Sequence, residues 1–224
     1  MRSRGCADDS QWSASSKPTR SPTTRLPPDG IGRGLIWHRI HQSSQGPIWF
    51  GGPNAYNRFN DPGPGAAHPR MPLAPIDAAS DVGGYGVCYL GTTPEAAFVA
   101  TFFRRLPSRV IAMSDLDARR ITEIRLIRDV QVVCLHGSGL LRANVDGSVT
   151  SGDTYALSQV VARLLWRHPA KFDGIEYPAR HDTHQFSVAL FDRAGDALAV
   201  GATAPLTDPH RLRSWITRYK FGLV

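Results

Sequence analysis

The sequence lacks several features that would assign the protein to a compartment or scaffold at once. No run reaches the roughly 18 apolar residues that a membrane-spanning helix needs. The basic N-terminus has no apolar segment behind it, which argues against a secretory signal. The three cysteines make an odd count without metal-type spacing, so neither a disulfide framework nor a cysteine-based zinc motif is indicated. These absences favour a cytoplasmic protein that does not enter a membrane.

Common catalytic signatures are missing as well. The chain has no G-x-G-x-x-G or G-x-x-x-x-G-K-[ST] motif, so the two usual phosphate-binding loops are absent. The glycine-rich "HGSGL" (136–140) precedes no expected helix, and we interpret it as a turn. No serine lies in a G-x-S-x-G elbow. His181 and His184 have no cysteine or carboxylate cluster beside them, and no metal site is expected.

The composition indicates one basic domain. A chain of 224 residues with 42% hydrophobic content is long enough for a single sizeable core. Its formal charge of +7 favours an anionic partner, which could be a nucleic acid, an acidic protein or a phosphate-bearing small molecule. Residues 1–33 are rich in Ser, Thr, Pro and Arg and are predicted to be a flexible leader. The domain is predicted over 34–224, with a long proline-rich loop at 62–84.

Strand and helix patterns alternate irregularly along the domain, which predicts an α+β fold with a mixed sheet rather than a doubly wound one. The runs at 109–113, 120–127 and 130–135 are expected to be neighbouring strands. Residues 178–185 are expected to be a loop. The remaining strands are predicted at 34–41, 85–90, 173–177 and 186–191, and helices at 92–107, 151–169 and 209–219.

The helix predicted at 92–107 poses a question about its function. Thr92 or Thr93 can cap it, and Pro94 suits its first turn. The residues that follow are apolar on every side, so this helix should be buried. It carries no obvious catalytic or ligand-binding side chain, although it lies among polar and glycine-rich segments.

Two arginines have sequence neighbours that are unusual for a charged side chain. Arg39 lies in the middle of a predicted strand among residues that favour burial, and Arg58 lies in the polar segment "AYNRFNDP". One interpretation is that Arg39 pairs with an acid or extends to solvent, while Arg58 is simply on the surface. The other is that both bind an anion, because guanidinium groups present a planar fork to phosphate oxygens.

Five segments in order resemble the RES-domain family, over about residues 35–193. They are "HRIH", "NRFNDP", "YGVCYLGTTPEAAFVATFFR", "DTYALSQVVARLL" and "FDGIEYPARHDTHQFSVALFDR". The resemblance implies a fold similar to ADP-ribosyltransferases, and the role of toxin in a bacterial toxin–antitoxin pair with an Xre-type antitoxin. It implies that NAD is the substrate, cleaved at the nicotinamide glycosidic bond by phosphorolysis or hydrolysis, without a metal.

Some members of the family ADP-ribosylate a protein, so the acceptor of the ADP-ribose stays open between phosphate, water and protein. Nucleic acid would be contacted only indirectly, through the antitoxin. Whether the chain forms a homo-oligomer also stays open. A catalytically silent module that binds NAD or a partner protein is the main alternative.

The resemblance also implies which residues act. Catalytic positions match Arg39, Arg58, Tyr89 and Ala100, and NAD-binding positions match Arg39, Arg58, Tyr89, Ser158, Ala179 and Arg180. Tyr89 would stack on nicotinamide or bond to the ribose; a packed core tyrosine is the plain alternative. The family's glutamate corresponds to Ala100, either through an introduced inactivating change or through natural loss. Because a carboxylate stabilises the cationic transition state or orients the acceptor, alanine would slow turnover about 10²- to 10⁴-fold.

Overall fold

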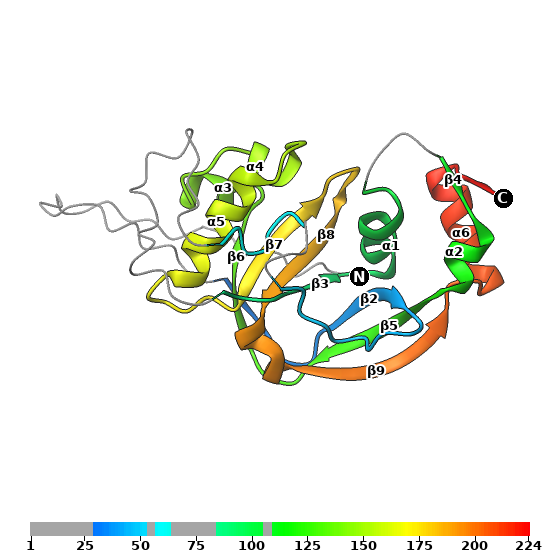
Figure 1. Cartoon of the computed structure of the whole chain (residues 1–224), viewed down its shortest axis with the longest axis horizontal. Helices are drawn as coiled ribbons and strands as arrows, with labels where there is room; N and C mark the ends of the chain where they lie inside the picture. Colours follow the sequence, from blue (N-terminus) through cyan, green and yellow to red (C-terminus); the bar gives the residue numbers. More distant parts are fainter. Residues whose placement is uncertain (1–28, 53–56, 64–83, 105–108) are drawn as a thin grey trace, which may run out of the picture.

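The computed structural model of the chain describes residues 29–52, 57–63, 84–104 and 109–224 (Figure 1). An eight-stranded sheet runs in the order β1 (Asp29–Ile31), β6 (Val130–Cys134), β7 (Gly174–Ala179), β8 (Asp182–Phe191), β3 (Val87–Gly91), β2 (Ile36–Gln42), β5 (Arg119–Leu126) and β9 (Leu198–Pro205). Strands β6 and β7 pair in parallel, and the other neighbours pair antiparallel. The α+β class with a mixed sheet is confirmed.

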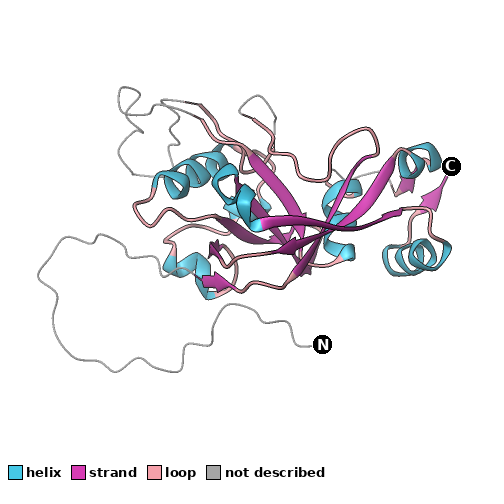
Figure 2. Cartoon of the chain, turned by 90° about the horizontal axis from the view of Figure 1, so that it is seen from below, coloured by secondary structure: helices cyan, strands magenta, loops and turns pink. Residues whose placement is uncertain are grey.

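Helices gather at both ends of the curled sheet, as the two views together show (Figures 1 and 2). They are α1 (Pro94–Phe102), α2 (Met113–Asp117), α3 (Ser138–Arg142), α4 (Ser148–Ser151), α5 (Ala156–Arg167), α6 (Pro209–Tyr219) and the 3₁₀ helix η1 (Asp192–Ala197). A second, two-stranded sheet pairs β4 (Val110–Ile111) with β10 (Gly222–Leu223). Within the described ranges, no helix combines the length and apolar character needed to cross a bilayer.

Helix α1 forms as its sequence predicts, and its central residues 96–99 are buried. The Thr93 side chain caps it by accepting a hydrogen bond of 3.0 Å from the Ala96 amide, and Pro94 occupies its first turn. The Phe98 ring stacks on Trp215 of α6 with ring centroids 4.2 Å apart. Helix α1 therefore packs between the sheet and α6, which explains why it is apolar on several sides. It ends at Phe102, and the expected end near 107 lies outside the described residues.

The expectation that residues 109–135 form three neighbouring strands is wrong. Strand β4 is two residues long and pairs with β10, outside the main sheet. Strand β5 cannot pair with β6, because β2 and β9 already occupy its two edges. Strand β6 instead lies between β1 and β7.

Three local expectations also need correction. The helix predicted at 151–169 begins at Ala156, because α4 and a short bend occupy its first residues. The "HGSGL" segment (136–140) opens α3 and is not only a turn. The loop expected at 178–185 is instead a tight hairpin, in which only positions 180 and 181 separate β7 from β8.

Strand structure is present earlier in the chain than predicted. Strand β1 falls inside the predicted leader and pairs antiparallel with β6. The Arg33 amide then donates a hydrogen bond of 2.6 Å to Asp129. Residues 1–28 of the leader and residues 64–83 of the predicted loop lie outside the described residues.

Candidate functional site

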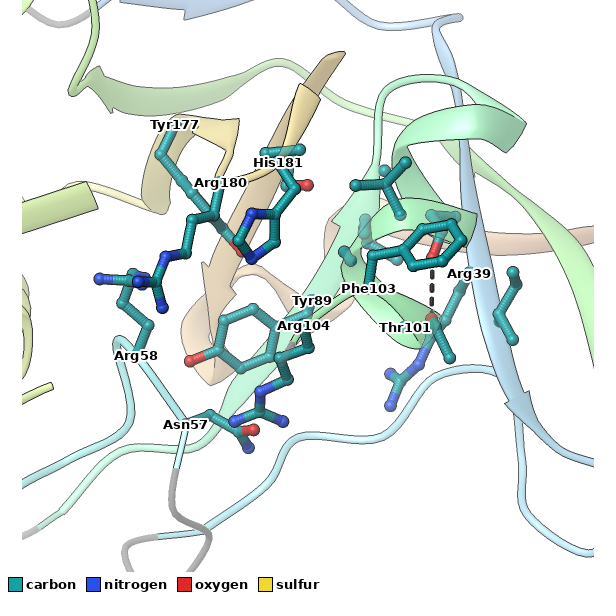
Figure 3. A pocket seen from close by; sticks show the side chains of 18 of the residues that line it. Arg39, Asn57, Arg58, Tyr89, Thr101, Phe103, Arg104, Tyr177, Arg180 and His181 are labelled. Carbon is teal, nitrogen blue, oxygen red and sulfur yellow. Dashed lines mark hydrogen bonds between the residues drawn. The ribbon is translucent and has the colours of Figure 1, made fainter. Parts of the chain in front are cut away.

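A cavity of about 280 Å³ lies where the central strands meet α1 (Figure 3). Its cationic and aromatic lining comprises Arg39, Arg58, Arg104, Arg180, His38, His181, Tyr89, Tyr155, Tyr177 and Phe103. Among the described residues that line it, none is an aspartate or glutamate. Four guanidinium groups without a lining carboxylate make this cavity suited to an anion with more than one negative charge.

Arg58 is buried in the cavity wall, with 8% of its surface exposed, so the interpretation of a simple surface arginine is wrong. Its guanidinium donates hydrogen bonds to the carbonyl oxygens of Val149 (3.3 Å) and Gly152 (3.1 Å). It also lies over the Tyr155 ring, 4.8 Å from the centroid. Burial lowers the pKa of this guanidinium, which nevertheless stays charged at neutral pH. Carbonyl oxygens and an aromatic face hold the cation in place without neutralising it.

Ser158 contributes indirectly to the position of Arg58, through a carbonyl oxygen that both residues contact. Its side chain is fully buried in α5 and does not line the cavity. The Ser158 hydroxyl donates a hydrogen bond of 2.5 Å to the Val149 carbonyl oxygen, which also accepts from Arg58. The structure thus places Ser158 where it orients a carbonyl that holds Arg58, rather than on the cavity surface.

Tyr89 lines the cavity at the centre of β3 and packs against the neighbouring core. Its hydroxyl accepts a hydrogen bond from the Phe59 amide and donates one to Asn60, both of 2.9 Å. Burial raises the pKa of this hydroxyl well above its ordinary value. Because the phenolic proton is engaged by Asn60, Tyr89 offers a ligand mainly its ring. The hydroxyl also fixes the 57–61 segment that carries Arg58.

Arg39 lines the same cavity from β2, on the side of α1 opposite to Arg58 (Figure 3). Its guanidinium donates hydrogen bonds of 2.9 Å to the Trp49 carbonyl oxygen and to the Cys88 sulfur. Among the described residues it forms no ion pair with an acid. Uncharged hydrogen-bond acceptors, rather than a carboxylate, therefore satisfy the charge on this strand.

Helix α1 contributes an apolar surface with one accessible position. Ala97 and Val99 line the cavity and are otherwise buried, whereas Ala100 lines it and is exposed. Thr101, the next residue, turns its hydroxyl back to the Ala97 carbonyl oxygen at 2.8 Å. A longer side chain at position 100 would thus reach the cavity without displacing the packed face of the helix.

The hairpin between β7 and β8 completes the wall beside Arg58. Ala179 is buried at the end of β7, and Arg180 and His181 follow in the turn, with their side chains directed into the cavity (Figure 3). Arg180 forms an ion pair with the exposed Asp153, and this lowers the pKa of the Asp153 carboxyl. The structure therefore brings all predicted site residues except Ser158 to one cavity.

Arg104, Tyr155 and Tyr177, which also line the cavity, were missed by sequence reasoning. The Arg104 guanidinium lies 5.7 Å from the Tyr155 ring centroid, on the same ring that Arg58 contacts. Tyr177 lies on β7, where burial raises its pKa to about 12. These residues come from separate elements, and their meeting depends on the sheet order. The sequence feature that could have pointed to Arg104 is the pair of adjacent arginines in "FFRR", directly after α1.

The group of potential metal ligands that the structure brings together lies away from the cavity. His184 is 92% exposed in its side chain and does not line the cavity with His181, so the two are not brought together there. Within the part of the chain that the structure describes, side-chain atoms of Cys134, His136 and Glu176 lie within 4.8 Å of one another, but the Cys134 sulfur is disulfide-bonded and offers no thiolate. The His136 and Glu176 side chains contact each other at 2.9 Å. None of these three lines the cavity.

Comparisons with known proteins agree with this architecture. A chain of the solved M. tuberculosis MbcT–MbcA toxin–antitoxin complex is similar, with a TM-score of 0.59 and 15% sequence identity. The similarity covers 83% of this chain and 92% of that chain, and at this identity it concerns the fold alone. No curated protein matches the sequence. The sequence model of the RES domain matches residues 36–213, and the chain therefore belongs to the RES-domain family.

Proposed function

We propose that the cavity binds NAD and cleaves its nicotinamide glycosidic bond slowly, and that the protein acts in the cytoplasm as the toxin of a toxin–antitoxin pair. The observation that carries the proposal is the group of four arginines lining one cavity with no carboxylate among its described lining residues. The pyrophosphate of NAD carries two negative charges, and guanidinium forks suit its oxygens. Family membership and the similarity to a chain of a solved toxin–antitoxin complex support the toxin role.

In this proposal Arg39 and Arg58 contact the pyrophosphate from two walls, and Arg180 adds to the positive field near Arg58. The Tyr89 ring packs against the nicotinamide riboside. A cavity of about 280 Å³ is at the small end for ligand sites, so the adenosine half would extend to the rim.

Ala100 determines how fast the proposed reaction runs. Cleavage of the glycosidic bond develops positive charge on the ribose, and the described lining offers no carboxylate to stabilise that charge. We therefore expect binding with slow turnover. A silent module that binds NAD or a partner is the second candidate, favoured by the same missing acid. Transfer of ADP-ribose to a protein is a further variant of the proposed chemistry.

An acidic antitoxin of the Xre type is the proposed partner. The formal charge of +7 favours rapid association with a partner of opposite charge. Contact with nucleic acid would then come through the antitoxin. Co-purification with an acidic partner encoded beside this chain is the expected outcome, and its absence would count against the toxin role.

The binding proposal is tested by calorimetric titration of the full chain with NAD. Arg58→Ala should weaken binding about 10- to 100-fold, because it removes a charged hydrogen-bond donor from the cavity. Arg125→Ala is the matched control, since Arg125 is exposed on β5 and does not line the cavity. Equal NAD affinity in both variants, or no binding by the unmodified chain, would refute the proposal.

A further inference from the structure

The described lining of the cavity offers few groups that can accept a proton. A guanidinium group cannot act as a base at neutral pH, which excludes the arginines of the lining. Burial raises the pKa of Tyr177 to about 12 and that of Tyr89 well above its ordinary value, so both phenols keep their protons. With no lining carboxylate among the described residues, the imidazoles of His38 and His181 are the remaining bases.

The two imidazoles occupy different surroundings. Burial lowers the pKa of His38, and the charges that influence it are Glu123, Glu95 and Arg211, which belong to β5, α1 and α6 rather than to the cavity's arginine group. His181 lies in the β7–β8 turn among Arg180 and Arg58, and its ring points into the cavity (Figure 3). It is also exposed, so it can exchange protons with solvent. His181 is therefore the base that points into the cavity, which Arg58 and Arg180 line together with Tyr89, the residue proposed to contact the nicotinamide riboside.

We infer that His181 is a catalytic general base, which partly replaces the acid absent at position 100. This inference rests on the proposed function. In the step concerned, the oxygen of a water molecule bonds to C1′ of the nicotinamide-bearing ribose. The C1′–N bond breaks, and its electron pair passes to the nicotinamide ring nitrogen. The proton of the water passes to a ring nitrogen of His181 and from there to solvent. The products are ADP-ribose, nicotinamide and one proton.

The chemistry explains why the replacement is partial. A glutamate can both stabilise the positive charge that develops on the ribose and orient the attacking water. A neutral imidazole can accept the proton but supplies no negative charge. His181 therefore supports hydrolysis at a rate below that of a chain with a carboxylate at position 100.

The charge environment keeps His181 in its active, unprotonated form. Burial and the nearby Arg180 and Arg58 lower its pKa below the ordinary histidine value of 6.5. Other titratable or charged groups on the elements around it are Arg104, Tyr155, Tyr177, Asp153, Asp182 and His184. Because the base must be unprotonated, kcat should rise with pH through a pKa below 6.5 and then level off.

The test measures release of nicotinamide from NAD by the full chain between about pH 5 and pH 8. His181→Ala should lower kcat about 100-fold with little change in KM, and should remove the acidic limb of the pH profile. His184→Ala is the matched control, because it removes a histidine from the same hairpin outside the cavity. Its kcat and pH profile should equal those of the unmodified chain. Added imidazole should restore part of the rate of His181→Ala.

Two outcomes would overturn the inference, and they are distinguishable. If the unmodified chain turns over NAD and His181→Ala does so with the same kcat and pH profile, the general-base role is wrong while the proposed function stands. If the unmodified chain binds NAD in the titration but releases no nicotinamide at any pH, with or without added phosphate, both the general-base role and the proposed cleavage by water or phosphate are wrong. A silent NAD-binding module, or transfer of ADP-ribose to a protein acceptor, then remains.

Discussion

The cavity has two walls that are built in different ways. The arginine wall consists of residues 57–61 with the Tyr155 side chain, and its polar atoms are held by a network of hydrogen bonds. The helix wall is the cavity-facing side of α1, where apolar side chains pack into an aromatic cluster behind them. A change in the first wall disturbs many partners, whereas Ala100 in the second wall is exposed and has few.

Because the two walls differ in this way, we assign ligand binding to the arginine wall and the rate of turnover to the helix wall. Arg58, proposed to bind the anion, is held by contacts in the buried wall of the cavity. The position proposed to accelerate the reaction lies on the exposed side of an otherwise buried helix. We therefore expect position 100 to accept either an alanine or an acid without cost to the fold.

The largest expected effect tests the helix wall. Ala100→Glu should raise the rate of nicotinamide release about 10²- to 10⁴-fold, because a carboxylate beside the ribose stabilises the developing positive charge. Nicotinamide release by purified protein and growth of cells expressing the variant both measure it. Ala100→Gln, of similar size and without charge, is the control and should stay slow. A glutamate variant as slow as the glutamine variant would contradict the proposed role of this position.

The next effect tests the arginine wall through stability. Arg163 of α5 is fully buried and forms an ion pair with Asp61, whose carboxylate also accepts from the amides of Gly63 (3.0 Å) and Tyr85 (3.3 Å). Arg163→Met should lower the free energy of unfolding by about 3–5 kcal/mol, since it leaves a buried carboxylate without its cation. Denaturant titration measures this change.

The double variant Asp61→Asn with Arg163→Met is the matched control for that experiment. It should recover part of the lost stability, because no unpaired charge is then buried. A loss below about 1 kcal/mol in Arg163→Met would show that this ion pair does not hold the arginine wall.

The smallest effect separates the two parts of Tyr89. Tyr89→Phe removes both hydrogen bonds to the 57–61 segment while keeping the ring, and should lower the free energy of unfolding by about 1–2 kcal/mol. NAD affinity should change by less than about threefold, since the ring and not the hydroxyl is proposed to contact the ligand. Denaturation and NAD titration measure the two quantities. A large loss of affinity at unchanged stability would assign the hydroxyl to the ligand.

Much of the fold could be predicted where periodicity was strong. The strands β2, β3, β7 and β8 and the helices α1 and α6 follow from alternating or capped patterns. Strand β9, with the sequence "LAVGATAP", was missed because it is rich in small residues and lies at the edge of the sheet. Strand β1 was missed because three residues give no period. The order of strands could not be predicted, since pairing across the sheet joins segments far apart in the chain.

Some residues of the candidate site could also be predicted from the sequence, and others could not. Arg39, Arg58, Tyr89 and Ala100 were proposed from family resemblance, and the structure shows that they line one cavity. No pattern in the sequence was strong enough to add Arg104 and His181 to the predicted site. Their chemistry depends on neighbours, because a guanidinium or imidazole becomes part of a site only through what surrounds it.

The sequence by itself determined a basic chain with an apolar, capped helix and a mixed set of strands, because these properties depend on composition and on residues close in the chain. Only the tertiary structure decided that Arg58 is a buried cation rather than a surface one, and that His181 faces the same cavity. The physical reason is that burial and electrostatic field come from residues distant in sequence, which strand pairing and helix packing bring together.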